Sequence, residues 1–310
     1  MPSAARVFTL LLILSGLAAL PAAAQAPAPI VREGKPGGIL RMVLREDLPQ
    51  GFSVHETVTN SVTWPSMPCY SNLVVYDQTK RLGRMDTIVP ELAEKWSWQD
   101  NYRNLVFFLR KDVKWHDGQP FTSKDVKFTF DTVREAADAP AKLRINPRKE
   151  WYANVDAVEA PDPYTVVFRL KRPQPSLVAM LASGYSPVIP AHVPIAEHRA
   201  RCIGTGPFKF KEWKRGQTVE LVRNPDYFVK GRPYLDGVRY TVIVERGTRV
   251  AALQANQIDV AYPGETTLSI AEQLKGAVPS MVFTETASNV SENLLLNTRK
   301  PPFDNVKVRR

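Results

Sequence analysis

The stretch Asn104–Asp131, NLVFFLRKDVKWHDGQPFTSKDVKFTFD, decides the fold of this chain. It opens with Asn104–Arg110, an apolar run rich in β-prone residues, which predicts a strand. The segment Asp112–Pro120 follows, and its Asp, Gly and Pro residues are typical of a tight turn. The chain is therefore expected to run along a strand and then reverse direction.

The rest of this stretch predicts a capped helix. Thr122 or Ser123 supplies the N-cap hydroxyl, and Asp125 places a carboxylate in the first turn, where it opposes the helix dipole. One face is apolar at the spacing i, i+4, i+7, through Val126, Phe130 and Val133. Strand, turn and capped helix together form a folding unit that carries no chemistry of its own.

The same stretch resembles a known family. The order F-x-L-R-K-x-V-K-W-H-D-G-x-P-F-T-x-x-D-V-x-F-T-F is similar to that of the extracellular solute-binding proteins of family 5. These are the peptide-, oligopeptide- and dipeptide-binding receptors of ABC importers, with nickel, glutathione and haem receptors among their relatives. Further matches are PELAEKW at Pro90–Trp96, GTGPF at Gly204–Phe208 and NPDYF at Asn224–Phe228. The resemblance implies an α/β fold of the periplasmic-binding-protein-like class II type, with mixed sheets and helices in two lobes.

The resemblance also implies how the chain is divided. Lobe I is expected over residues 25–65 and 202–289, and lobe II over 66–201, with a hinge crossing between 184 and 206. Residues 290–310 are expected to begin a third lobe, because NLLLNTRKPPFDNVKVRR is similar to the family's entry to that lobe, with Asp304 as a helix N-cap. The sequence stops one turn into this helix, so we expect a truncated receptor whose third lobe is largely missing. We accordingly expect weak or no peptide binding by these residues alone.

Composition and charge narrow the class of protein. The chain has 310 residues, of which 44% are hydrophobic and 23% charged, as in a soluble globular protein of about two domains. A formal net charge of +10 can favour nucleic acid or anionic lipid. However, the basic residues are spread along the chain, and no basic block is interleaved with aromatic residues as a strand-binding groove requires. We therefore expect a basic surface and no nucleic-acid partner.

The N-terminal segment 1–24 has the features of a signal peptide. Arg6 provides a positive start, and Val7–Ala19 is apolar but too short to span a bilayer comfortably. Ala22–Ala24 forms an A-x-A cleavage site, so Gln25 is the expected mature N-terminus. No cysteine follows as a lipid anchor. We expect an exported, soluble, periplasmic protein.

Cys69 and Cys202 are the two cysteines of the sequence. In an oxidising compartment such a pair can bridge. Because they lie far apart, a bridge would close a long loop and stabilise the fold by roughly 4–5 kcal/mol in the entropic model. The family resemblance does not supply this pair, so a bridge and two free thiols both remain open.

Candidate ligand contacts lie in two places along the chain. Thr57, Thr59, Asn60 and Ser61 offer short polar side chains that can hydrogen-bond a ligand backbone, and in the family this region borders the cleft. The alternative interpretation is an N-cap and ordinary turn polarity before the next helix. Tyr185, in the expected hinge crossing, is the fifth candidate.

Motifs for catalysis and for cofactor or metal binding are absent from the sequence. The four histidines are not spaced as a metal pair on a helix, and no H-E-x-x-H, G-x-S-x-G, C-x-x-C or P-loop occurs. The pair Gly204 and Gly206 lacks the third glycine of a dinucleotide site, because Lys209 stands there, and is expected to permit a tight turn. His116 and Asp117 are interpreted as structural residues of a turn. We expect no enzyme, no metal site and no cofactor.

The expected function is a monomeric receptor that captures di- or oligopeptides by lobe closure and delivers them to the permease of an ABC transporter. Such recognition uses main-chain hydrogen bonds and roomy pockets for variable side chains. Two alternatives stay open. One is a receptor of the same fold for a non-peptide solute such as a metal chelate, opine or saccharide. The other is an exported hydrolase, which would need a nucleophile and base that the sequence does not reveal.

Local patterns predict further elements. Strands are expected at 37–44, within 71–77, and at 164–170, 208–210, 218–222, 238–243, 257–261 and 281–286. Helices are expected at 176–182, 249–256 and 268–274. The segment 90–98 is expected to begin with a short turn of helix and to continue as a strand through Trp96 and Trp98, which core packing would bury.

Overall fold

The computed structural model describes residues 34–80, 82–262, 264, 266–284 and 295–309. The predicted export segment, residues 1–24, lies outside the described residues. Among the described helices, none combines the length and the apolar character that crossing a membrane requires.

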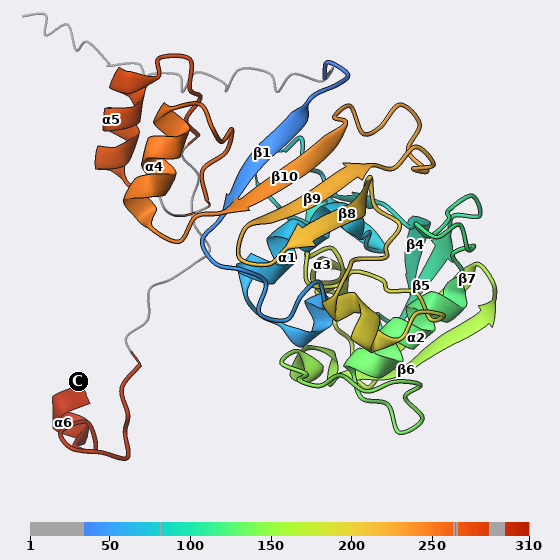
Figure 1. The fold of residues 1–310 in the computed structure, drawn as a ribbon. Helices are drawn as coiled ribbons and strands as arrows, with labels where there is room; N and C mark the ends of the chain where they lie inside the picture. Colours follow the sequence, from blue (N-terminus) through green and yellow to red (C-terminus); the bar gives the residue numbers. More distant parts are fainter. Residues whose placement is uncertain (1–33, 81, 263, 265, 285–294, 310) are drawn as a thin grey trace, which may run out of the picture. The chain divides into compact units, whose positions relative to one another are not determined.

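One four-stranded sheet joins the start of the described chain to strands much later in the sequence (Figure 1). Its order is β1 (Ile39–Leu44), β10 (Gly237–Val242), β9 (Thr218–Arg223) and β8 (Phe208–Lys214). Strand β1 is parallel to β10, and the other neighbouring pairs are antiparallel. The strands predicted at 37–44, 208–210, 218–222 and 238–243 are therefore confirmed.

A second four-stranded sheet is antiparallel throughout. Its order is β4 (Ala93–Gln99), β5 (Asn104–Leu109), β7 (Thr165–Leu170) and β6 (Val155–Asp162). Helix α2 (Ser123–Val133) packs on β6 and β7. Two short strands, β2 (Val74–Tyr76) and β3 (Ile88–Pro90), pair antiparallel with each other.

The deciding stretch folds as predicted, with strand β5, a turn and helix α2. Thr122 is the N-cap of α2, and the carboxylate of Asp125 accepts a hydrogen bond from its backbone N–H at 2.8 Å. The apolar face predicted for the helix is buried to 1% exposure or less at Val126, Phe130 and Val133.

The remaining helices are α1 (Asn60–Ser66), α3 (Leu177–Leu181), α4 (Arg246–Gln254), α5 (Leu268–Ala277) and α6 (Val306–Arg309). Short 3-10 helices span Val54–Glu56, Met67–Cys69, Met85–Thr87, Lys149–Tyr152 and Ile195–Arg199. The helices predicted at 176–182, 249–256 and 268–274 are confirmed. Helices α4 and α5 contact each other and bury a small apolar cluster with Val43 and Tyr262.

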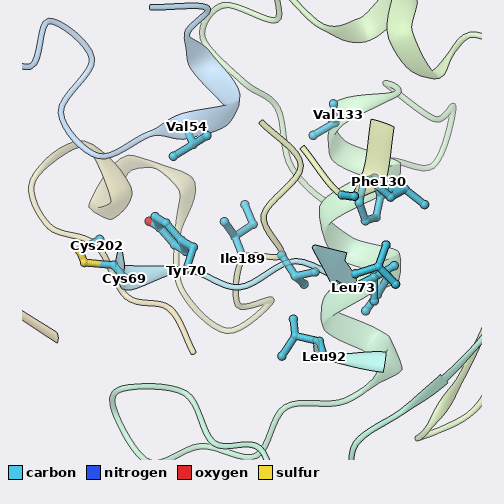
Figure 2. Packing of buried hydrophobic residues seen from close by; sticks show 14 of the residues in the cluster. Val54, Cys69, Tyr70, Leu73, Leu92, Phe130, Val133, Ile189 and Cys202 are labelled. Carbon is cyan, nitrogen blue, oxygen red and sulfur yellow. A yellow bond between two sulfur atoms is a disulfide. The ribbon is translucent and has the colours of Figure 1, made fainter. Parts of the chain in front are cut away.

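A large apolar core includes buried residues from both four-stranded sheets. Figure 2 shows part of it, including Leu73, Leu92 and Phe130 of α2. The same view shows that Cys69 and Cys202 are joined by a disulfide, with their Cα atoms 6.2 Å apart. Of the two possibilities that the sequence left open, the structure has the bridge.

Two of the family motifs bond to each other beside this disulfide. The backbone N–H of His116 donates to the carbonyl of Gly204 at 2.8 Å, and its ring Nε2 lies 3.0 Å from the carbonyl of Gly206. The N–H of Gly204 in turn donates to Nδ1 of His116 at 3.3 Å, so Nε2 carries the ring proton. Burial lowers the pKa of His116 to about 4, which keeps the ring neutral. His116 therefore holds the two motifs together, in agreement with its structural interpretation.

Some local predictions are wrong. The expected turn of helix at the start of 90–98 does not form: Pro90 ends β3, and Ala93 already begins β4. The reason is tertiary pairing, because the N–H groups of Leu92 and Ala93 donate to the carbonyls of Asn72 and Leu73. Trp96 and Trp98 are half-buried and pack against the core.

Three predictions concern the later part of the chain. Segment 257–261 makes one isolated bridge, Met42 with Val260, and is not a strand, because Asp259 bonds Arg41 with both its backbone and its side chain. Residues 281–284 contain no strand, and the rest of the strand expected at 281–286 lies outside the described residues. The N-terminal turn of α6 is capped by Asn305, not Asp304, since Oδ1 of Asn305 accepts from the N–H of Lys307 at 2.9 Å.

Candidate ligand-binding site

Four of the five predicted contact residues surround the first turn of α1. Thr59 is the N-cap, and its Oγ1 accepts a hydrogen bond from the N–H of Ser61 at 3.2 Å. Oγ1 of Thr57 accepts from the N–H of Thr59 at 3.1 Å. Thr57 and Ser61 are buried, Thr59 is half-buried and Asn60 is exposed. The segment thus contains the N-cap that the alternative interpretation expected, and Asn60 is its outward-facing polar side chain.

A carboxylate that the sequence reading did not select lies beside this turn. Glu46 is exposed, just beyond the end of β1. Its Oε1 accepts a hydrogen bond from Oγ of Ser61 and lies 3.5 Å from Oγ1 of Thr59. These hydroxyls hold the carboxylate against the first turn of α1.

Tyr185 reaches the same turn although it lies 125 positions after Asn60 in the sequence. Its hydroxyl donates to Oδ1 of Asn60 at 2.9 Å and lies 3.2 Å from the carbonyl of Val58. The structure therefore brings together the two segments that were predicted separately as ligand contacts. Whether these residues bind ligand stays a prediction.

Behind Tyr185 lies a buried cation. The side chain of Arg148 has 0% exposure, and its guanidinium Cζ is 5.0 Å from the ring centre of Tyr185 and 5.8 Å from that of Trp151. The two rings meet edge to face with centroids 5.9 Å apart. Nη2 of Arg148 donates to the carbonyl of Val54.

Apolar side chains border the polar atoms of this surface. Val58 is 61% exposed, Met67 50% and Trp151 40%. Gly184 packs against Met67, because an added Cβ would lie 2.7 Å from Met67 Cε. Polar groups on an apolar surface are a common arrangement in small-molecule sites. We call the set Glu46, Asn60, Arg148, Trp151 and Tyr185 the α1 site.

Asn60 and Tyr185 were predicted from the sequence, and the other members of the α1 site were not. Arg148 and Trp151 fall in PRKEWY, where a basic residue precedes an aromatic residue by three positions, as on one side of a helical turn. That spacing was the available signal. No pattern near Glu46 in the sequence pointed to a site, because its hydrogen-bond partner, Ser61, lies 15 positions later in the chain.

A separate cavity of about 360 Å³ lies beside His116 and shares no residue with the α1 site. Its charged groups are already paired across short distances: His192 with Asp117 at 2.6 Å, and Arg201 with Glu197 at 2.9 Å. No cluster of three or more His, Cys, Asp or Glu side chains arranged for a metal ion occurs in the described part of the chain.

Comparison with known proteins gives this site its context. Residues 87–310 match the family described as "Bacterial extracellular solute-binding proteins, family 5 Middle". The oligopeptide-binding protein AppA of Bacillus subtilis is 38% identical over 175 residues, which are 53% of this chain and 31% of AppA. The dipeptide-binding protein of Escherichia coli K12 is 27% identical over 288 residues, 86% of this chain and 52% of that protein.

Solved structures show the same fold. AppA in complex with a nonapeptide matches with a TM-score of 0.64 at 30% identity, over 77% of this chain and 47% of AppA. The binding protein MoaA of A. tumefaciens R10, in complex with mannopinic acid, matches with a TM-score of 0.72 at 26% identity, over 89% of this chain and 54% of MoaA.

The chain spans between 31% and 52% of the length of the curated relatives it matches. The fold is the α/β fold of the two-lobed periplasmic binding proteins, as the sequence predicted. This chain belongs to the bacterial extracellular solute-binding proteins of family 5.

Proposed function

We propose that this chain is part of a periplasmic receptor that captures di- or oligopeptides and delivers them to the permease of an ABC transporter. The observation that carries the proposal is the contact of Tyr185 with Asn60, which makes one surface from two segments predicted as ligand contacts. The names of the relatives support a peptide ligand. The proposed receptor is monomeric and is exported by cleavage of segment 1–24 near Ala24.

The proposed lobes follow the two four-stranded sheets. Lobe I, residues 25–65 and 202–289, would contain the sheet of β1, β8, β9 and β10, and lobe II, residues 66–201, the sheet of β4 to β7. Tyr185 comes from lobe II and Asn60 from lobe I, so their hydrogen bond would join the lobes near the hinge. Closure of such lobes over a ligand is a common binding motion.

At the α1 site the chemistry suits a peptide. The amide of Asn60 can donate to a ligand carbonyl while its Oδ1 accepts from Tyr185, and Glu46 offers a carboxylate to an ammonium group. The exposed apolar atoms of Val58, Met67 and Trp151 provide contact area for side chains without fixing their identity.

Titration calorimetry with trialanine and a dipeptide library tests the proposal, using protein expressed from the complete gene. Because Tyr185→Phe removes the hydroxyl that positions Asn60, we expect about three- to tenfold weaker peptide binding. Tyr102→Phe is the matched control, since Tyr102 is exposed and packs on Trp98. Equal affinity of all three proteins, or no peptide binding by any, would contradict the proposal.

One alternative ligand class is favoured by an observation. The similar protein MoaA is solved with mannopinic acid, so an opine-type solute at the same site is the second candidate. Including mannopinic acid in the titration separates the two classes. The family consists of binding proteins. Recovery of an unchanged peptide after incubation with the protein would count against the hydrolase alternative.

A further inference from the structure

The buried guanidinium of Arg148 lacks the partners that a buried charge normally has. Among the residues that the structure describes, none offers a hydrogen-bond acceptor to its Nε or Nη1, and Nη2 has one carbonyl. Within the described residues no carboxylate lies within ion-pair distance of it. Buried charges are usually paired because an uncompensated charge is costly to desolvate. Arg148 is therefore an exception that structural stability alone does not explain.

The buried carboxylate that follows Val54, the carbonyl partner of Arg148, is bonded to other groups. Glu56, two residues beyond Val54, accepts two hydrogen bonds from Arg199, at 2.6 and 2.7 Å, and one from the backbone N–H of Arg144 at 2.6 Å. The charge of Arg148 is consequently not neutralised by Glu56. Its influence is visible at His55, whose pKa falls to about 3, first through burial and second through the charge of Arg148.

The guanidinium is covered by two aromatic rings that reach the surface. It lies against Tyr185 and Trp151, and Trp151 is 40% exposed. A cation on one face of a ring offsets the negative potential of that ring, so the outer face becomes more attractive to an anion. The neighbouring Lys149 is paired with Glu135 at 2.6 Å, and Glu150 is exposed, where water and salt screen it.

We propose that Arg148 makes the outer surface of Tyr185 and Trp151 a subsite for a carboxylate group of the ligand. This inference rests on the proposed function, since it names a chemical group that the α1 site takes. Glu46, on the Ser61 side of the same turn, supplies the opposite charge. The arrangement selects zwitterionic ligands with a free carboxylate over their amides.

The first test needs no ligand. The fluorescence of Trp151, isolated as the difference between the native chain and Trp151→Phe, is quenched with iodide, caesium and neutral acrylamide. We expect the ratio of iodide to acrylamide quenching to be about threefold higher in the native chain and in Arg148→Lys than in Arg148→Met. If Arg148→Met does not fold, Arg148→Gln takes its place, because it removes the charge and keeps a hydrogen-bond donor for the carbonyl of Val54. Quenching that is insensitive to the sign of the quencher overturns the proposal.

The second test uses trialanine and trialanine amide as probes in calorimetry, with protein expressed from the complete gene. The unsubstituted protein and its Arg148→Lys variant should bind the free acid about tenfold more tightly than the amide, and Arg148→Met should reduce that preference to about twofold. A preference that is unchanged in Arg148→Met overturns the carboxylate subsite while leaving peptide binding in place. If neither peptide binds, the proposed peptide-receptor function is wrong. The iodide measurement then decides by itself whether Arg148 makes the surface of Trp151 attractive to anions.

Discussion

At the scale of single residues, Gly204 shows why a motif needs glycine. The pair Gly204 and Gly206 was expected to permit a tight turn, but neither has a positive φ angle. Instead, an added Cβ on Gly204 would lie 1.9 Å from the carbonyl oxygen of Cys69, a rigid backbone atom. The glycine permits close approach of two chain segments beside the disulfide.

Gly204→Ala should therefore destabilise the fold by about 3 kcal/mol, because the clashing atoms cannot move without shifting the junction. Urea unfolding monitored by tryptophan fluorescence measures this change. Gly276→Ala is the matched control: Gly276 lies in α5, and nothing stands within 4 Å of its added Cβ. That variant should gain about 0.5–1 kcal/mol of helix stability. Equal stabilities of the two variants would refute the steric explanation.

At the scale of elements, α2 is held at its start by one carboxylate with two partners. Asp125 accepts from the N–H of Thr122 at 2.8 Å and from the N–H of Ala191 at 2.9 Å, and it is 5% exposed. Asp125→Ala leaves both N–H groups without an acceptor, so we expect a loss of about 2–4 kcal/mol in unfolding free energy.

Chemical denaturation of Asp125→Ala beside Asp138→Ala checks this expectation. Asp138 is exposed in the loop after α2, and its substitution should change stability by less than about 0.5 kcal/mol. If both variants have the same urea midpoint as the native chain, the capping hydrogen bonds of Asp125 do not contribute to stability.

Elements were predictable where the local pattern and the tertiary environment agree. The apolar run of β5 and the apolar face of α2 are sufficient signals, because burial of one face stabilises the element that the pattern already favours. Segment 90–98 was not predictable in this way, since hydrogen bonds from Leu92 and Ala93 to the residues just before β2 override its helical appearance.

Only the polar surface residues of the α1 site could be predicted from the sequence. Asn60 and Tyr185 could be proposed from residue type, but their contact depends on how residue 185 returns to α1, which no local pattern encodes. Arg148 was unexpected for the same reason that it is interesting: charged residues are rarely buried without a partner. The sequence pattern favours an exposed position for it.

At the scale of the whole molecule, three buried histidines make stability depend on pH. Burial lowers the pKa of His55 to about 3 and those of His116 and His198 to about 4. Because these values lie below the unfolded value of about 6.5, the unfolded state binds more protons as the pH falls from 6.5. Stability should fall through this window by about 2–3 kcal/mol per histidine at pH 4.5.

Urea midpoints measured between pH 7 and 4.5 test this dependence. His198→Gln should reduce the slope by one proton. A midpoint that does not vary over this range would show that the histidines protonate without unfolding the chain.

Glu91 contributes with the opposite sign. Burial raises its pKa to about 7, above the unfolded value of about 4.5, and the N–H of Asn72 donates to its carboxylate at 2.7 Å. The protonated form is favoured in the folded state, so its contribution to stability is lost as the pH rises from 4.5 to 7. Glu91→Gln keeps an acceptor for Asn72 and should be about 3 kcal/mol more stable than the native chain at pH 8. The two proteins should be equal at pH 4.5, and a gain that is the same at both pH values would contradict the titration of Glu91.

The disulfide between Cys69 and Cys202 acts on the largest scale, because 133 positions separate its cysteines. It closes the segment that contains the whole sheet of β4 to β7, and its sulfur atoms are buried beside the junction of His116 with Gly204. In the entropic model, closing a loop of this length destabilises the unfolded chain by about 5 kcal/mol.

The double variant Cys69→Ser, Cys202→Ser should therefore lose about 3–5 kcal/mol of unfolding free energy. Its stability should not depend on reductant, while the native chain should lose a similar amount of stability once its disulfide is reduced. A double variant within 1 kcal/mol of the oxidised native chain would mean that packing around Tyr70 and Gly206 holds the junction without the covalent bond.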